Sequence, residues 1–180
     1  MLPVYLERGF SELFTSILVA IIIIPLFLGV KVLLRKKDSI TVLNTMVEVA
    51  WLAIVIAILS ITGILGADFG VTSLFEGTSV ISFNFLTEGI TTATILNVIL
   101  FIPFGFLSTI VFKRIQSKWI YGVAVGFAFT AIIEFLQSFT GRLVQIDDIV
   151  MNTLGAYIGY MLCVYILNFK PLKKFKLMNE

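Results

Sequence analysis

The sequence has 180 residues, of which 59% are hydrophobic and only 13% are charged, and its formal net charge is +2. A soluble domain is typically about half apolar and about a quarter charged, so this composition excludes an ordinary soluble domain. The sequence holds no histidine and one cysteine, Cys163. An intramolecular disulfide is therefore excluded, and the usual general base and transition-metal ligand are absent.

The apolar residues lie in runs of roughly twenty residues, the length that crosses the core of a bilayer. Five such runs predict an all-α integral membrane protein with five transmembrane helices, formed by residues 1–180 as a single domain. In chain order the predicted spans are residues 12–34, 42–65, 94–112, 119–139 and 148–167, with a long loop at 66–93. Pro25 in the first span and Pro103 in the third predict kinks.

Lysine and arginine residues predict the orientation of these spans. They gather in the loop after the first span, in the loop between the third and fourth spans, and after the fifth span. Loop 66–93 has no basic residue, and loop 140–147 has only Arg142. Because cytoplasmic loops are enriched in basic residues, we expect the N-terminus outside and the C-terminus in the cytoplasm. Orientation also accounts for the lysine clusters without a nucleic-acid partner.

Glu134 lies in the middle of the apolar run VAVGFAFTAIIEFLQSF, which contains no basic residue. In lipid a carboxylate costs several kcal/mol unless it is partnered, protonated or wetted, so such a residue is a functional candidate. Counting about 1.5 Å per residue predicts that Asn97 and Asn152 lie at the level of Glu134, roughly 5–8 Å below the outer edge. The predicted site is an outward-facing pocket formed by Asn97, Glu134, Gln137, Arg142, Asp147, Asp148 and Asn152.

Each residue of this pocket has a functional and a structural interpretation. Glu134 is the candidate acid or base, and the other residues are candidates for substrate binding. Asp147 and Asp148 could hold a divalent cation such as Mg²⁺ or Ca²⁺, a weak signal, and no other cofactor is expected. Alternatively an aspartate caps the last helix, Arg142 neutralises Glu134, and the amides only join helices. Glu48 is expected to reach water.

Small residues continue the polar stripe of the last span. Gly155 and Gly159 lie seven and eleven residues after Asp148, on the face that also carries Asn152. Small residues let membrane helices approach closely. We therefore expect the polar and glycine face of this span to point into the protein.

Three segments, NVILFIPFGFL (97–107), IIEFLQSFTGR (132–142) and DDIVMNTLGAYIG (147–159), resemble the VanZ-like family of small membrane proteins. The resemblance covers residues 94–160, and the first two spans match only in general character. The positions that fit the pattern of the family are Asn97, Pro103, Gly105, Glu134, Gln137, Arg142, Asp148, Asn152 and Gly155. Segment 83–86 departs from it, because it lacks a proline that members often carry before the third span.

The resemblance implies a context rather than a mechanism. The family takes its name from a protein associated with low-level resistance to the glycopeptide teicoplanin in Gram-positive bacteria, so a multi-pass protein of the bacterial cytoplasmic membrane is implied. The favoured hypothesis is a pocket that binds, and in one version processes, a cell-envelope lipid, a lipid-linked precursor or a lipoglycopeptide. The alternative is a non-enzymatic scaffold or partner subunit. A transporter is disfavoured, because no inverted repeat is visible. Whether the chain is an enzyme stays open.

Overall fold

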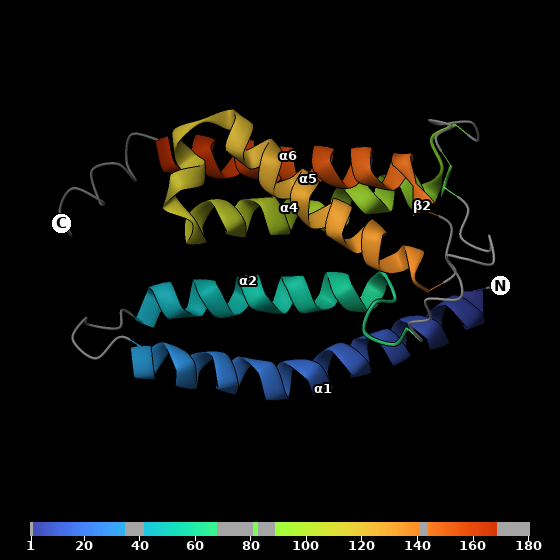
Figure 1. Ribbon diagram of the computed structural model, residues 1–180, viewed down its shortest axis with the longest axis horizontal. Coiled ribbons are helices and arrows are strands. Elements are labelled where there is room, and N and C mark those ends of the chain that lie inside the picture. The colour runs from blue at the N-terminus through green and yellow to red at the C-terminus, as the bar shows by residue number, and fades with distance from the viewer. Residues whose placement is uncertain (1, 35–41, 68–80, 83–88, 141–143, 169–180) are drawn as a thin grey trace. The chain divides into compact units, whose positions relative to one another are not determined.

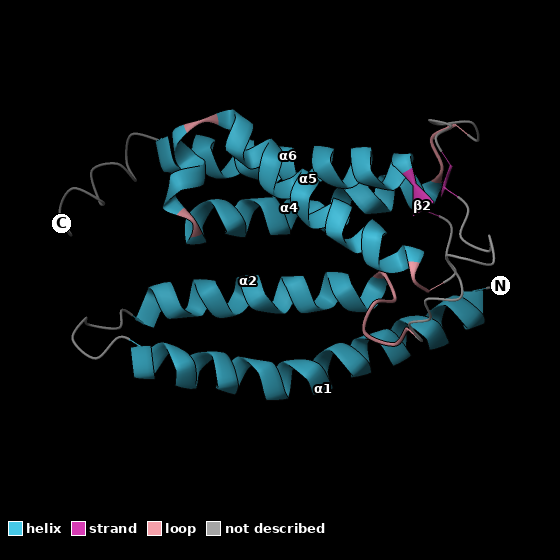
Figure 2. Ribbon diagram, in the orientation of Figure 1, coloured by secondary structure: helices cyan, strands magenta, loops and turns pink. Residues whose placement is uncertain are grey.

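The computed structural model describes residues 2–34, 42–67, 81–82, 89–140 and 144–168, and these residues are mostly helical (Figures 1 and 2). The helices are α1 (Leu2–Leu34), α2 (Val42–Ile61), α4 (Thr92–Val111), the short 3-10 helix η1 (Lys113–Ser117), α5 (Trp119–Ser138) and α6 (Ile146–Asn168); the strands are β1 (Ile81–Ser82) and β2 (Val144–Gln145). Five helices are long and apolar enough to cross a membrane. The predicted all-α class is thus confirmed, and the chain is consistent with a multi-pass membrane protein.

The helices follow the predicted spans closely, with one exception at the start. α1 begins at Leu2, whereas the predicted span began at residue 12, and the strongly apolar part of α1 is Ile17–Leu34. The residues before that part are more polar, which ends an apolar run but does not end a helix. Pro25 and Pro103 both lie inside unbroken helices. Within the long loop predicted at 66–93, strand β1 pairs with β2; residues 68–80 and 83–88 of this loop lie outside the described residues.

The chain divides into two compact units, and each is described separately. Unit 1 consists of Met1–Val80 and Phe135–Val144, and unit 2 consists of Ile81–Glu134 and Gln145–Glu180. In unit 1, α1 lies alongside α2 (Figure 1). In unit 2, α4 lies alongside α6 (Figure 1). The last turn of α5 belongs to unit 1, and the rest of this helix belongs to unit 2.

A glycine cap ends α2 in unit 1. Gly63 has a φ of 78°, and its N–H donates to the carbonyl of Ser60 over 2.8 Å. The N–H of Ile64 donates to the carbonyl of Leu59 over 2.9 Å, which completes a Schellman motif. The Gln137 Nε2 group donates to the carbonyl of Thr62 over 2.8 Å. The terminal carbonyls of α2 are therefore hydrogen-bonded, as a buried helix end requires.

Glycines set the distance between α4 and α6 in unit 2. A methyl group added to Gly155 would lie 2.2 Å from the carbonyl oxygen of Val98, and one added to Gly159 would lie 2.0 Å from that of Ile102. On α4, a methyl group at Gly105 would lie 2.0 Å from the carbonyl oxygen of Ala156. Backbone therefore packs directly on backbone along this contact. The expectation that the glycine face of α6 points inward is confirmed.

Further small and aromatic residues attach α5 to the other helices of unit 2. Gly126 of α5 faces the methyl group of Ala156, because a methyl group at Gly126 would lie 2.6 Å from it. The rings of Phe104 and Phe129 stack with centroids 4.4 Å apart, which joins α4 to α5. Three helices thus share one tightly packed interior, and the polar residues of unit 2 lie within it.

Replacing Gly159 by alanine should destabilise the protein, because the added methyl group has no room between α6 and the carbonyl of Ile102. We expect a loss of about 1–3 kcal/mol, the usual effect of overpacking a close contact. The matched control is Gly29→Ala, since Gly29 lies within α1 and has nothing within 4 Å of an added methyl group. Thermal stability of both variants in detergent measures the difference. Equal stability of the two variants would contradict the close contact.

Candidate functional site

Three hydrogen bonds join polar groups of α4, α5, β2 and α6 within unit 2. The Asn97 Nδ2 group donates to Asp148 Oδ1 over 2.5 Å. The Asn152 Nδ2 group donates to Thr130 Oγ1 over 2.9 Å. The backbone N–H of Gln145 donates to Glu134 Oε2 over 3.3 Å. We call these residues the polar cluster: Asn97, Thr130, Glu134, Gln145, Asp148 and Asn152.

Helical spacing explains how the cluster forms. Thr130 and Glu134 are four residues apart on α5, and Asp148 and Asn152 are four residues apart on α6. Residues at this spacing share a helix face, so each helix presents a short polar stripe. The hydrogen bond between Asn152 and Thr130 shows that the two stripes meet.

The first turns of α4 and α6 fix the outer members of the cluster. The start of α4 is held by a capping box between Thr91 and Thr94, which positions Asn97 about one turn further on. Asp147 and Asp148 both lie in the first turn of α6, where negative charge is stabilised by the helix dipole. Neither aspartate precedes the helix, so the expectation that one of them is the N-cap is wrong.

The inner members of the cluster are almost completely buried. Glu134 and Asn152 are each 3% exposed, and Thr130 is 0% exposed. Among the described residues, Asn152 Oδ1 is the one buried side-chain oxygen or nitrogen without a hydrogen-bond partner. An unsatisfied buried acceptor costs about 1–3 kcal/mol, so such an atom in a folded protein requires an explanation.

The cluster has two levels rather than the single level that was expected for Asn97, Glu134 and Asn152. Asn152 pairs with Thr130, which lies four residues, or about 6 Å along the helix, from Glu134. Asn97 pairs instead with Asp148, in the first turn of α6. Counting residues from the helix ends placed all three side chains in the same region but did not predict which of them meet.

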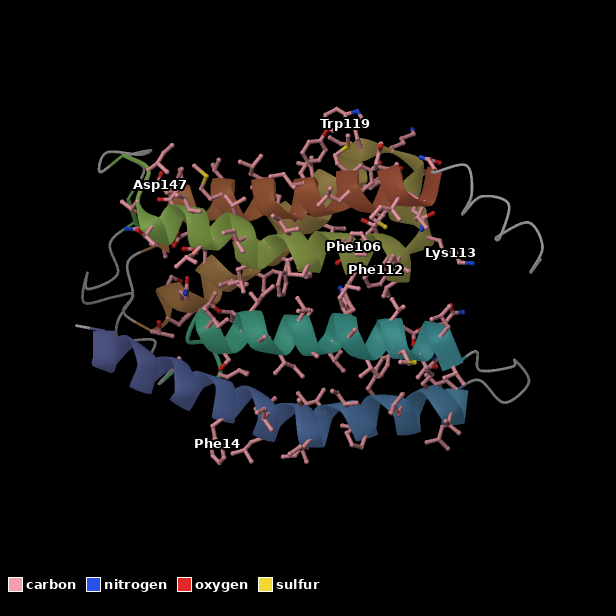
Figure 3. All side chains as sticks on the ribbon, turned by 180° about the vertical axis from the view of Figure 1, so that it is seen from behind. Phe14, Phe106, Phe112, Lys113, Trp119 and Asp147 are labelled. Atoms are coloured by element: carbon pink, nitrogen blue, oxygen red, sulfur yellow. The ribbon has the colours of Figure 1, made fainter. Side chains whose placement is uncertain are left out.

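Two of the seven predicted site residues, Gln137 and Asp147, do not join these hydrogen bonds. Gln137 is 9% exposed and gives its amide to Thr62 within unit 1. Asp147 is half-buried in the first turn of α6, at the end of unit 2 opposite Lys113 (Figure 3). Arg142 lies outside the described residues. The structure thus brings together Asn97, Glu134, Asp148 and Asn152, and it adds Thr130.

No group of three or more metal-binding side chains of the His, Cys, Asp or Glu type occurs among the described residues. Asp147 and Asp148 are therefore not accompanied there by a third such side chain. A divalent cation at this pair stays a prediction.

A second buried polar contact, in unit 1, was missed by the sequence analysis. Lys31 of α1 is 8% exposed and forms an ion pair with Glu48 of α2. Its ammonium group also donates to Thr45 Oγ1 over 2.9 Å. The side chain of Glu48, which was expected to reach water, is 20% exposed and is also paired with Lys31. The sequence did carry a signal for this ion pair, because a lysine lies near the end of the first span and a glutamate near the start of the second.

An apolar groove lies over the same part of unit 1. Its volume is about 330 Å³, and it is lined by Leu28, Val42, Thr45, Met46 and Val49. Thr45 is its only polar lining residue, and this threonine accepts the hydrogen bond from Lys31. The groove therefore suits hydrocarbon rather than a polar ligand.

The profile of the VanZ/LLP1 family matches residues 13–168. The chain belongs to the VanZ/LLP1 family. The match includes α2 and most of α1, so the likeness is wider than the 94–160 region in which the motifs were visible. No curated protein and no solved structure gives a significant match. The polar cluster and the glycine contacts of this VanZ/LLP1 protein thus have to be interpreted from their own geometry.

Removing one partner of the Lys31–Glu48 pair should destabilise this VanZ/LLP1 protein more than removing both. Each single change, Lys31→Met or Glu48→Leu, leaves a largely buried charge, which costs up to about 3 kcal/mol. The double variant leaves no charge and is expected to recover most of that loss. Melting temperatures of the four proteins of this cycle measure the coupling. Additive losses in the double variant would contradict a coupled pair.

Proposed function

We propose that the polar cluster binds the polar head group of a cell-envelope lipid, a lipid-linked precursor or a lipoglycopeptide at the outer face of a bacterial cytoplasmic membrane. The supporting observation is the burial of Glu134 and Asn152 within helices that are apolar enough to cross a membrane. Burying polar groups in such surroundings costs free energy. A protein that keeps buried polar groups in its apolar helices is therefore expected to use them.

The orientation of the helices is part of this proposal. The basic residues described in unit 2, Lys113, Arg114 and Lys118, are at the η1 end of the helices, and Lys113 lies opposite Asp147 (Figure 3). With the η1 end in the cytoplasm, the polar cluster is at the outer face. A ligand would then reach it from the outer leaflet.

Four of the predicted residues have a role in the proposed site. Asn97 and Asn152 orient polar groups of the ligand, and Glu134 serves as the acid or base if the ligand is processed. Arg142 pairs with a phosphate or carboxylate. Membership of the VanZ/LLP1 family supports a link to teicoplanin resistance in Gram-positive bacteria, and this link is also proposed rather than observed.

The scaffold alternative has weaker support. A scaffold would need a close-packing face for a partner, which stripes of glycine on a helix could offer. Gly155 and Gly159 already face α4, and Gly122 and Gly126 face Tyr160 and Ala156 of α6. Since these four glycines are used inside unit 2, they leave no glycine face for a partner.

Glu134→Gln should abolish ligand retention while the protein still accumulates, because glutamine keeps an acceptor for the N–H of Gln145 but loses the charge. The measurement is mass spectrometry of lipids and precursors that co-purify with the wild type, Glu134→Gln and Arg142→Ala. Gln116→Ala is the control, since Gln116 hydrogen-bonds the carbonyl of Thr109 at the η1 end of unit 2. If Glu134→Gln retained the same co-purified molecules as the wild type, a role for this carboxylate would be refuted.

The proposed orientation has its own test, which the single buried cysteine simplifies. Cys163 is 1% exposed, so the wild type should not react with a membrane-impermeant maleimide. In intact cells we expect Ile90→Cys, at an exposed position before α4, to be labelled, and Arg114→Cys, in η1, to be labelled only after lysis. The opposite pattern would place the polar cluster at the cytoplasmic face.

A further inference from the structure

The polar cluster contains one hydrogen-bond acceptor that the protein does not use. Asn152 is 3% exposed, and its Oδ1 atom has no partner, although its Nδ2 group is held by Thr130. The hydrogen bond to Thr130 fixes the carboxamide, so Oδ1 is presented in a defined position. A buried acceptor of this kind matches a donor that is supplied from outside the chain.

The nitrogen groups of the cluster that the structure shows bonded, in contrast, each donate to an acceptor within it. The amide of Asn97 donates to Asp148, and the backbone N–H of Gln145 donates to Glu134. The amide of Asn152 donates to Thr130. The unmatched group is thus an acceptor, which favours a ligand that donates hydrogen bonds over one that only accepts them.

The charge of the polar cluster points in the same direction. The cluster holds two acids, Glu134 and Asp148, and no basic residue, so its formal charge is −2. Glu134 and Asp148 belong to the cluster itself, and Glu134 is almost fully buried. Charges interact more strongly in a buried site than in water, so the site attracts cations and repels a purely anionic group.

We propose that the ligand of the polar cluster carries an ammonium group, which donates a hydrogen bond to Asn152 Oδ1 and is attracted by the carboxylates of Glu134 and Asp148. This inference rests on the proposed function and names the head-group chemistry of the same site. A primary ammonium combines a positive charge with three N–H donors, whereas a phosphate or carboxylate offers acceptors only.

Three probe lipids that differ only at the head-group nitrogen test the inference. Phosphatidylethanolamine has a cation with N–H donors, phosphatidylcholine has a cation without them, and N-acetyl-phosphatidylethanolamine has an N–H donor without the cation. The full chain is purified in detergent, mixed with each probe, and the bound lipid is quantified by native mass spectrometry. We expect phosphatidylethanolamine to be retained about tenfold better than either of the other probes, the usual effect of a hydrogen bond to a charged group.

Two variants at Asn152 assign that preference to its oxygen. Asn152→Leu, of similar size, should abolish the preference, and Asn152→Asp should increase it because the acceptor gains a negative charge. Gln116→Leu, at the η1 end of unit 2, is the control and should keep the wild-type preference. If Asn152→Leu fails to accumulate, an unchanged preference in Asn152→Asp overturns the inference on its own.

The outcomes separate this inference from the proposed function. The wild type could retain all three probes equally, with a loss of retention in Glu134→Gln. That result would refute the inference that the ligand carries an ammonium group, and it would leave the proposed function standing. Equal retention of phosphatidylethanolamine and phosphatidylcholine overturns the hydrogen bond to Asn152, because charge alone then suffices. If no probe is retained above the level of Glu134→Gln, the proposed ammonium ligand is refuted, and the co-purification experiment decides the proposed function separately.

Discussion

The contact of α4 with α6 through glycine is the constraint on which the site depends. Val98 and Ile102 present carbonyl oxygens to Gly155 and Gly159, so the two backbones lie about as close as helices can. Such contacts allow little sliding, since any shift brings a larger side chain against a carbonyl. The register of the helices is therefore fixed, and Asn97, the residue before Val98, is held beside Asp148 in the first turn of α6.

The same register explains why the polar residues are tolerated. A buried amide or carboxyl group destabilises a protein unless its hydrogen bonds are made, and these bonds need accurate distances. The stripe of α6 that carries Asn152 meets the stripe of α5 that carries Thr130 because Gly126 lets α5 approach Ala156. The glycines thus stabilise the fold, and they also bring together polar groups that no single helix could satisfy.

Much of the fold could be predicted from the sequence, because hydrophobic length and small-residue spacing are local properties of a helix. The five spans and the inward glycine face of α6 followed from them. The start of α1 did not, since a helix continues through polar residues that a hydropathy pattern excludes. The wider family match, which includes α2, likewise shows that the motifs visible by eye were only the most distinctive part of the likeness.

The candidate site was predicted in its composition but not in its pairings. Counting residues gives the depth of a side chain, whereas a hydrogen bond also depends on how each helix is rotated about its axis. Gln137 was assigned to the site by its spacing from Glu134, yet it binds the capped end of α2. Thr130 was overlooked because a helical threonine usually bonds a carbonyl of its own helix, as Thr109 does. Glu48 was expected to reach water because it lies near the end of its span, and its pairing with Lys31 was not foreseen.

The composition of the polar cluster bears on whether the protein catalyses a reaction. Acid–base catalysis of a group transfer or hydrolysis requires an attacking group as well as a proton carrier. The described cluster contains one hydroxyl group, Thr130, which is fully buried and accepts a hydrogen bond from Asn152. The chain has no histidine that could activate this hydroxyl. If the proposed ligand is processed, Glu134 would therefore have to act on a group that the ligand or water brings.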